Sequence, residues 1–213
     1  MALLLDHQID SYAAAGLPAL AGQSESAFRA LFEPLRTPAS RMSQTADARE
    51  GSVPYLAVVS DGLIDPAARV PGLRLPGSSR TGILDRNHGD EGLAPYRSRD
   101  EMSVPDAGVY LLIEVDRGDE WRDVPPRDAR PAIEGRGRTA LTIAEGLSLL
   151  TAHPGVLRTN HCFMLAGSTR GDKRVPALWI SKRAPKLGWC FEGVPHSWLG
   201  VASAGGRIGP TIV

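Results

Sequence analysis

The apolar residues of this 213-residue chain occur only in short runs, and this limits the available architectures more than any other feature. The longest uninterrupted runs, such as Val109–Ile113, are five residues long. A membrane-spanning helix needs roughly 20 residues. Gly (23) and Pro (17) recur often enough to divide the chain into short elements, while 42% hydrophobic residues still allow a sizeable core. The sequence therefore predicts an ordered, loop-rich globular protein with no membrane partner.

The start of the chain and its two cysteines bear on the compartment. Met1–Asp6 has no basic segment and reaches a carboxylate after three leucines, which is not typical of a secretory signal. Two cysteines in a chain of this length are more often buried small hydrophobic residues than a disulfide. We therefore expect a cytoplasmic protein.

The net charge of zero conceals an asymmetry along the chain. Residues 1–149 hold 16 Lys and Arg against 22 Asp and Glu, whereas residues 150–213 hold 8 against 2. Such an asymmetry can indicate a surface for anions or nucleic acid. The alternative is that the acidic and basic parts pack together and neutralise each other.

Apolar spacing predicts helices at the N-terminus. Leu5, Ile9 and Tyr12 fall on one helical face, and Ser24 is placed to cap a second helix that ends near Leu35. The polar composition of the segment that follows predicts a loop or linker. Pro and Gly then recur through residues 61–106, where we expect short strands only around Leu73 and Ile83. The predicted organisation is a single α+β domain, 1–213, with a helical part (1–35), a loop or linker (36–54) and an α+β body (55–213).

The second half of the chain carries clearer signals. Val109–Val115 is the best strand, a short helix is expected over Arg127–Ile133, and Thr142 with Glu145 has the form of a capping box that begins another helix. Further strands are expected over Cys162–Leu165, Val175–Lys182 and Leu187–Phe191. The last two would form a hairpin with a four-residue turn, which pairs Trp179 with Cys190 and Ile180 with Trp189. No element is predicted for residues 200–213. Grouped strands favour an α+β sheet, mixed or antiparallel.

Several stretches of the chain carry a family resemblance. They are Thr139–Thr142, Glu145-Gly146, His153-Pro154, Val156–Arg158, Arg174–Ser181, Pro185–Cys190 and Pro195–Gly200, with Gly16–Gly22 and Phe28-Arg29 near the N-terminus. In these stretches the chain is similar to an uncharacterised bacterial family, a domain of unknown function common in high-GC genomes. The resemblance implies a soluble bacterial protein and no particular activity, so it leaves any cofactor unknown.

The C-terminal part interleaves tryptophans with cations. Trp179, Trp189 and Trp198 lie among basic residues, and this mixture suits single-stranded nucleic acid, because cations attract phosphates and aromatic faces stack on bases. Tryptophans in strands are also common in cores. We expect binding of RNA or a ribonucleoprotein without catalysis. The candidate anion-binding residues are Arg170, Lys173, Arg174, Lys182, Arg183 and Lys186.

An enzyme is the main alternative. Cys190 could act as a nucleophile beside His196 or His161, because an imidazolium lowers the pKa of a nearby thiol. A packed core cysteine is the simpler interpretation, and a protein-interaction module is a third possibility. Metal binding is not expected, because His161 and Cys162 are adjacent and would point to opposite faces of a strand.

Overall fold

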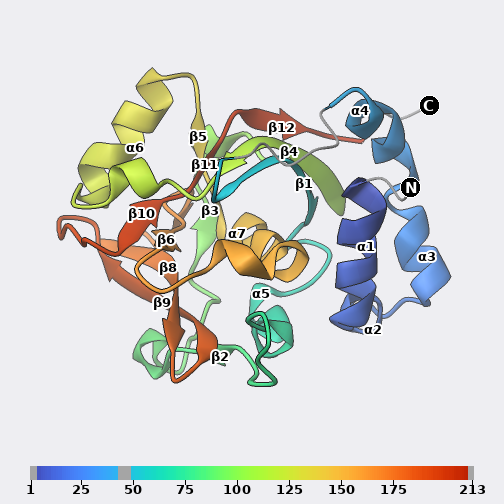
Figure 1. Cartoon of the computed structure of the whole chain (residues 1–213), viewed down its shortest axis with the longest axis horizontal. Coiled ribbons are helices and arrows are strands. Elements are labelled where there is room, and N and C mark those ends of the chain that lie inside the picture. Colours follow the sequence, from blue (N-terminus) through green and yellow to red (C-terminus); the bar gives the residue numbers. More distant parts are fainter. Residues whose placement is uncertain (1–3, 43–48, 211–213) are drawn as a thin grey trace.

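The computed structural model describes residues 4–42 and 49–210, and it confirms the α+β class. The N-terminal helices pack together on one side of the molecule, at the right in Figure 1. Ser24 caps its helix as predicted, by accepting a hydrogen bond from the Ala27 N–H. These helices are α1 (Leu4–Ala14), α2 (Leu17–Leu20), α3 (Glu25–Ala30), the 3-10 helix η1 (Glu33–Leu35) and α4 (Arg36–Ser40).

The loop predicted for residues 36–54 is wrong at both of its ends. Helix α4 occupies its first five residues, and strand β1 (Ser52–Val59) begins within it. Pro38 lies in the first turn of α4, where a missing N–H costs no helical hydrogen bond, and Ala39 is buried. The middle of the predicted loop, residues 43–48, lies outside the described residues.

Two sheets form the body of the protein. In the first, the order is β1-β4-β11-β5, and β12 also pairs with β4. In the second, the order is β10-β6-β8-β9-β2, with the β10–β6 and β2–β9 pairs parallel. A two-stranded β3–β7 pair lies apart. The remaining bounds are β2 (Ile83–Leu84), β3 (Arg97–Ser98), β4 (Val109–Asp116), β5 (Thr139–Ala140), β6 (Cys162–Met164), β7 (Ser168–Thr169), β8 (Arg174–Ser181), β9 (Ala184–Phe191), β10 (Leu199–Val201), β11 (Ser203–Ala204) and β12 (Gly206–Ile208).

The tail predicted to carry no element in fact supplies three short strands, β10 to β12. Its small residues have little strand propensity of their own, so these strands form only through tertiary contacts. Gly205 shows why small residues are needed, because a Cβ at this position would collide with the side chain of Glu114. The strand expected around Leu73 is also absent, since Leu73 is a buried residue that follows a 3-10 turn.

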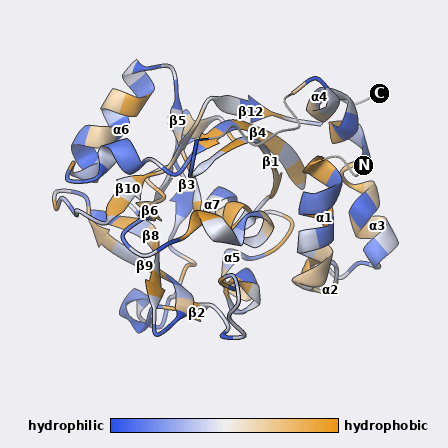
Figure 2. Cartoon of the chain, in the orientation of Figure 1, coloured by the Kyte–Doolittle hydropathy of each residue, from blue (hydrophilic) through white to orange (hydrophobic). Residues whose placement is uncertain are grey.

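Helix α7 (Ile143–Ala152) lies at the centre of the molecule, and every residue from Ile143 to Leu150 is buried. Its predicted capping box is present, with Thr142 and Glu145 each bonding the other's backbone N–H. Figure 2 shows hydrophobic residues along α7, β1 and β4, between a core on the side of the N-terminal helices and a larger core that includes the second sheet.

The other helices are α5 (Pro66–Arg69), α6 (Pro126–Gly135) and the 3-10 helices η2 (Val70–Gly72), η3 (Arg86–His88), η4 (Asp100–Met102), η5 (Asp119–Trp121) and η6 (Pro154–Val156). No helix in the described ranges is long and apolar enough to cross a membrane.

Buried polar side chains cover the outer edge of strand β1. Gln8 of α1 donates to the Tyr55 carbonyl (3.0 Å) and accepts from the Ala57 N–H (2.7 Å), so its amide replaces a neighbouring strand. Further along, Ser148 of α7 accepts from the Val59 N–H and Arg69 of α5 donates to the Val59 carbonyl. An uncovered edge would leave these buried backbone groups unpaired.

The β8–β9 hairpin differs from its prediction in register. Its turn has two residues, Lys182 and Arg183, with φ of 51° and 63°, and positive φ at both positions defines a type I′ turn. The predicted four-residue turn is therefore wrong. The observed pairs are Trp179 with Lys186, Ile180 with Pro185, Pro176 with Trp189 and Val175 with Cys190.

Replacing Gln8 with Met tests the covered edge of β1. The substitution keeps the side-chain length but leaves two buried backbone groups without a partner, so the free energy of unfolding should fall by about 2–4 kcal/mol. Urea denaturation measures this loss. The matched control is Gln23→Met, because the Gln23 side-chain oxygen accepts no hydrogen bond and its replacement should cost little. Equal losses for the two variants would contradict this role of Gln8.

Candidate functional site: an aromatic–arginine surface on the hairpin

The structure divides the six candidate cations into two groups. Arg170, Lys173 and Arg174 lie where strand β8 begins, whereas Lys182, Arg183 and Lys186 lie at or near the turn of the hairpin. The seven residue steps between the ends of β8 span about 23 Å. Arg174 and Lys186 point to opposite faces, because Lys186 pairs with Trp179, an odd number of residues from Arg174. The six cations therefore do not form one continuous basic face.

Ion pairs neutralise most of the basic C-terminal part. Four of its cations pair with carboxylates from residues 1–149, which supports the expectation that the two parts compensate each other. Within the described ranges, Lys173, Lys182 and Arg183 make no ion pair. The four pairs are Arg158–Glu50, Arg170–Glu91 (3.2 Å), Lys186–Asp85 (2.8 Å) and Arg207–Glu145 (2.6 Å).

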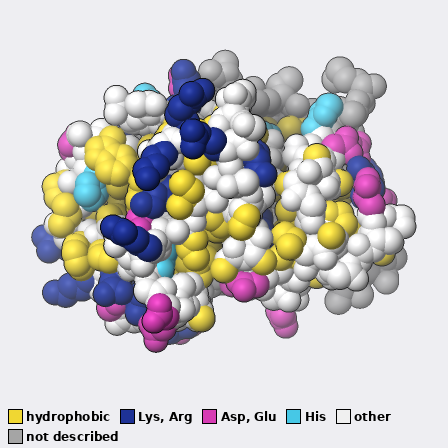
Figure 3. Space-filling view, turned by 90° about the horizontal axis from the view of Figure 1, so that it is seen from below, with side chains coloured by type: hydrophobic (Ala, Val, Ile, Leu, Met, Phe, Trp, Pro, Cys, Tyr) yellow, Lys and Arg dark blue, Asp and Glu magenta, His cyan; other side chains and the backbone are white. Residues whose placement is uncertain are grey.

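An exposed aromatic cluster lies beside the first group of cations. The guanidinium of Arg174 lies 4.7 Å from the ring centroid of Trp189, and Phe191 meets the same indole edge to face at 5.0 Å. Phe191 is 52% exposed. We call Lys173, Arg174, Trp189 and Phe191 the aromatic–arginine surface. Figure 3 shows Lys and Arg side chains on the side of the molecule that carries the hairpin, with hydrophobic side chains among them.

Trp189 does not lie in the core, where tryptophans of strands are often found. Its indole N–H donates to the Asn87 carbonyl at 3.0 Å, and its ring is only partly buried beneath Arg174. The predicted contact with Ile180 is absent because the hairpin register differs. Trp189 therefore lies at the protein surface, with the guanidinium of Arg174 against one face of its ring.

The other two tryptophans of the C-terminal part form a separate cluster on the opposite face of the hairpin. Trp179 and Trp198 meet edge to face at 6.3 Å, and His196 contacts Trp198 at 5.6 Å. The Trp179 ring also covers Gly188 so closely that a side chain at this position would collide with it. Trp179 is therefore committed to packing and is a poor platform for a ligand.

Cys190 lies in an apolar environment. Its Sγ is 3.1 Å from the Met164 sulfur, and burial raises the pKa of its thiol to about 12. His196 contacts Trp198, and His161 is hydrogen-bonded to Asp119, so the described contacts bring neither histidine to Cys190. The arrangement gives no support to a Cys–His nucleophile.

His161 belongs to a cluster that the sequence analysis did not find. Its Nδ1 lies 2.8 Å from Asp119, whose carboxylate also accepts from the buried side chain of Arg117 (2.9 Å). Burial acts to raise the pKa of Asp119, but hydrogen bonds from Arg117 and His161 outweigh it and hold the pKa below its usual value. Arg117 also donates to the Val156 carbonyl, so the cluster ties η5 to η6. In the sequence, the only indication of this cluster was that Arg117 and Asp119 lie close together.

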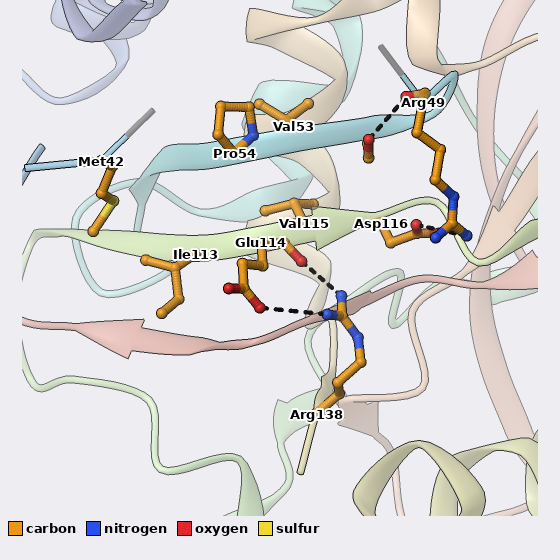
Figure 4. A pocket seen from close by; sticks show the side chains of 10 residues that line it. Met42, Arg49, Val53, Pro54, Ile113, Glu114, Val115, Asp116 and Arg138 are labelled. Carbon is orange, nitrogen blue, oxygen red and sulfur yellow. Dashed lines mark hydrogen bonds and ion pairs between the residues drawn. The ribbon is translucent and has the colours of Figure 1, made fainter. Parts of the chain in front are cut away.

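A pocket of about 490 Å³ lies against strands β1 and β4 (Figure 4). Its floor is apolar, and Glu114 in the middle of β4 has a φ of 51°. Arg138 donates to the Glu114 carbonyl at 2.6 Å and faces its carboxylate, while Arg49 pairs with Asp116 at 3.1 Å. Because each charge faces an opposite charge from the protein, the pocket has no unmatched group that would select a ligand.

Across the described ranges, no three His, Cys, Asp or Glu side chains are grouped so as to hold a metal ion.

The fold and surface define an α+β protein whose C-terminal hairpin presents arginine and aromatic side chains. The chain belongs to a family described as Family of unknown function (DUF5701), which matches residues 11–210. This confirms the family resemblance inferred from the sequence, which carried no activity. No curated protein and no solved structure matches the chain.

Native-state alkylation tests the environment of Cys190. A buried, neutral thiol should react with iodoacetamide slowly in the folded protein and readily in urea, because the thiolate is the reactive form. Mass spectrometry of the tryptic peptide measures both rates. Fast native alkylation that is abolished by His196→Ala would instead favour the enzyme hypothesis.

The Asp119 cluster should make stability depend on pH. Because the folded pKa of Asp119 lies below the unfolded value of about 3.9, its contribution is present above that value and is lost as the pH falls through the folded pKa. Asp119→Asn should therefore lower the free energy of unfolding at pH 7 by about 3 kcal/mol, and by less at pH 3, since the buried Arg117 is left with only the more distant carboxylate of Glu50 at 3.8 Å. Urea denaturation at the two pH values measures this. Asp128→Asn, at an exposed pair, is the control; a loss independent of pH would contradict the assignment.

Proposed function

We propose that this protein is a non-enzymatic binder of an anionic partner, single-stranded RNA or a ribonucleoprotein, in the bacterial cytoplasm. The observation that carries the proposal is the exposed ring of Phe191 beside Trp189 and Arg174. An exposed aromatic face can stack on a base of any sequence, and an arginine over a neighbouring ring can contact the adjacent phosphate. This interpretation predicts stacking on Phe191 and charge contacts around it.

Cations without a carboxylate partner supply the second part of the argument. Lys173 adjoins Arg174 at one end of the hairpin, and Lys182 and Arg183 lie at the other end. Among the described residues these three make no ion pair, so they can neutralise phosphates without first losing an internal partner. A strand of several nucleotides could follow the roughly 23 Å between the two ends.

The enzyme hypothesis and the protein-interaction hypothesis depend on different observations. The enzyme hypothesis would need an ionised Cys190, and burial raises the pKa of this thiol to about 12. A protein-interaction module has one specific observation in its favour, because Val194 (43% exposed) adds to the apolar area near Phe191. The two binding hypotheses differ in salt dependence, since contacts with phosphates release counterions and apolar contacts do not.

Fluorescence anisotropy with a labelled single-stranded RNA oligonucleotide tests the proposal. Phe191→Ala should weaken binding by about 5- to 150-fold, the range expected when one base stack of about 1–3 kcal/mol is removed. The matched control is Leu20→Ala, because Leu20 is a similarly exposed apolar residue (42%) on α2, among the N-terminal helices. No binding at about 50 mM salt, a condition that favours phosphate contacts, would refute the proposal. Salt-independent capture of a protein through Phe191 would favour the interaction module.

The hairpin turn allows the charge contribution to be measured without disturbing the fold. Replacing Lys182 with Asn and Arg183 with Gly removes both cations and installs the pair that a type I′ turn prefers. Stability should be unchanged or slightly higher. If both cations bind RNA phosphates, the slope of log affinity against log salt should become shallower by about 0.7 for each of the two cations removed. An unchanged slope would show that the turn does not touch the RNA.

A further inference from the structure

Three side chains that lie next to the aromatic–arginine surface have buried polar atoms that make no hydrogen bond. His88 is only 3% exposed, and neither of its ring nitrogens makes a hydrogen bond. The hydroxyl of Tyr96 and the Nη1 of Arg170 are also buried and unpartnered. Such groups are rare in proteins because burial removes their bonds to water, and each one calls for an explanation such as a water or an ion.

These three side chains are neighbours. The rings of His88 and Tyr96 meet edge to face at 5.7 Å, and the guanidinium of Arg170 lies 5.8 Å from the Tyr96 ring centroid. They are also joined to the surface described above. Asp172 forms an ion pair with Arg170 at 3.1 Å and another with Arg174 at 3.7 Å. Asn87, which precedes His88, accepts the indole N–H of Trp189.

The chemistry of the cluster suits an oxyanion. Burial raises the pKa of Tyr96 to about 12, so its hydroxyl keeps the proton and can donate it in a hydrogen bond. Burial also lowers the pKa of His88, so its ring is neutral and has one N–H to donate. Arg170 adds a third donor and a positive charge. Three donor atoms with no acceptor of their own, one of them on a cation, match the oxygens of a phosphate group.

An internal carboxylate already occupies part of this cluster. Glu91 pairs with Arg170 Nη2 at 3.2 Å from the loop between η3 and β3, while its own side chain is largely exposed. Gly89 and Gly92, on either side of Glu91, have φ of 73° and 56°, in the left-handed region that favours glycine. The loop therefore covers Arg170 with a negatively charged group held at its exposed side.

We propose that His88, Tyr96 and Arg170 form a binding site for a terminal phosphate of RNA, and that Glu91 competes with this phosphate for Arg170. The inference rests on the proposed function and names a subsite for it. A terminal phosphate fits better than an internal one, because the unpartnered atoms are enclosed. A monoester can enter from one side, whereas a phosphodiester has chain on both sides. The free phosphate oxygens would accept from Tyr96, His88 and Arg170 once the Glu91 loop moves aside.

The discriminating substitution is Tyr96→Phe, which removes one oxygen that has no partner in the protein. Competition anisotropy with one oligonucleotide carrying a 5′-phosphate, a 3′-phosphate or neither measures its effect. The wild-type protein should bind one phosphorylated end at least about fivefold more tightly, and Tyr96→Phe should lose most of that preference while keeping its affinity for the unphosphorylated strand. Its melting temperature should not fall, since the hydroxyl makes no internal hydrogen bond. A lower melting temperature with an unchanged end preference would overturn the proposal.

Glu91→Gln tests the competition directly. Removing the charge should raise affinity for the phosphorylated end severalfold, whereas the control Glu25→Gln, at an exposed pair on α3, should not. Equal affinity for all three oligonucleotides would overturn this inference and leave the proposed function intact. If no RNA binds, the proposed function fails. The subsite is then tested alone by titrating inorganic phosphate and following the His88 ring by NMR. A saturable shift that Tyr96→Phe abolishes supports the site, and no shift overturns it.

Discussion

The fold depends on one buried carboxylate, that of Glu145 in helix α7. It accepts from Arg207 Nε (2.6 Å) and Nη2 (2.9 Å), from the Tyr110 hydroxyl (2.9 Å) and from the Thr142 N–H (2.7 Å). A charge taken out of water is tolerated only when it is paired and its remaining lone pairs are satisfied, and both conditions hold. The partners come from β4, β12 and the start of α7, so a single side chain joins the central strand, the C-terminal strand and the central helix.

The same helix positions the functional surface. The first N–H of α7, that of Ile143, donates to the hydroxyl of Ser168 at 2.9 Å, and Ser168 belongs to β7, which leads directly to Arg170. Gly146 in the middle of α7 lies so close to Leu165 that a larger residue would displace it. The position of helix α7, the β6–β7 segment and Arg170 beside the surface are therefore coupled through short contacts. Disturbing the core near Glu145 should move Arg170, although the two residues lie on different elements.

The sequence was most informative where structure is decided locally. The strand at Val109–Val115 and the capping box of Thr142 and Glu145 could be predicted, because apolar spacing and capping act over a few residues. The hairpin register could not, since Lys182 and Arg183 adopt positive φ without the Asn-Gly pair that usually signals a type I′ turn. The C-terminal strands were missed because Gly, Ala and Ser pair with β4 and β5 only once those strands exist. The cations were recognised by type, but their ion pairs depend on residues far away in the sequence, about 100 positions for Lys186 and Asp85.

These ion pairs limit how many cations near the surface are available to a polyanion. A sequence count treats every arginine as available to a polyanion, whereas Arg170 and Arg174 share Asp172, and Arg170 also holds Glu91. A phosphate that binds Arg170 must replace a carboxylate, and replacing one anion by another changes the net electrostatic attraction little. Any binding energy gained there comes from donors that the carboxylate does not reach, namely the Tyr96 hydroxyl and the His88 ring. Selectivity would thus arise from the unsatisfied neutral donors, while the unpaired cations Lys173, Lys182 and Arg183 supply attraction that salt weakens.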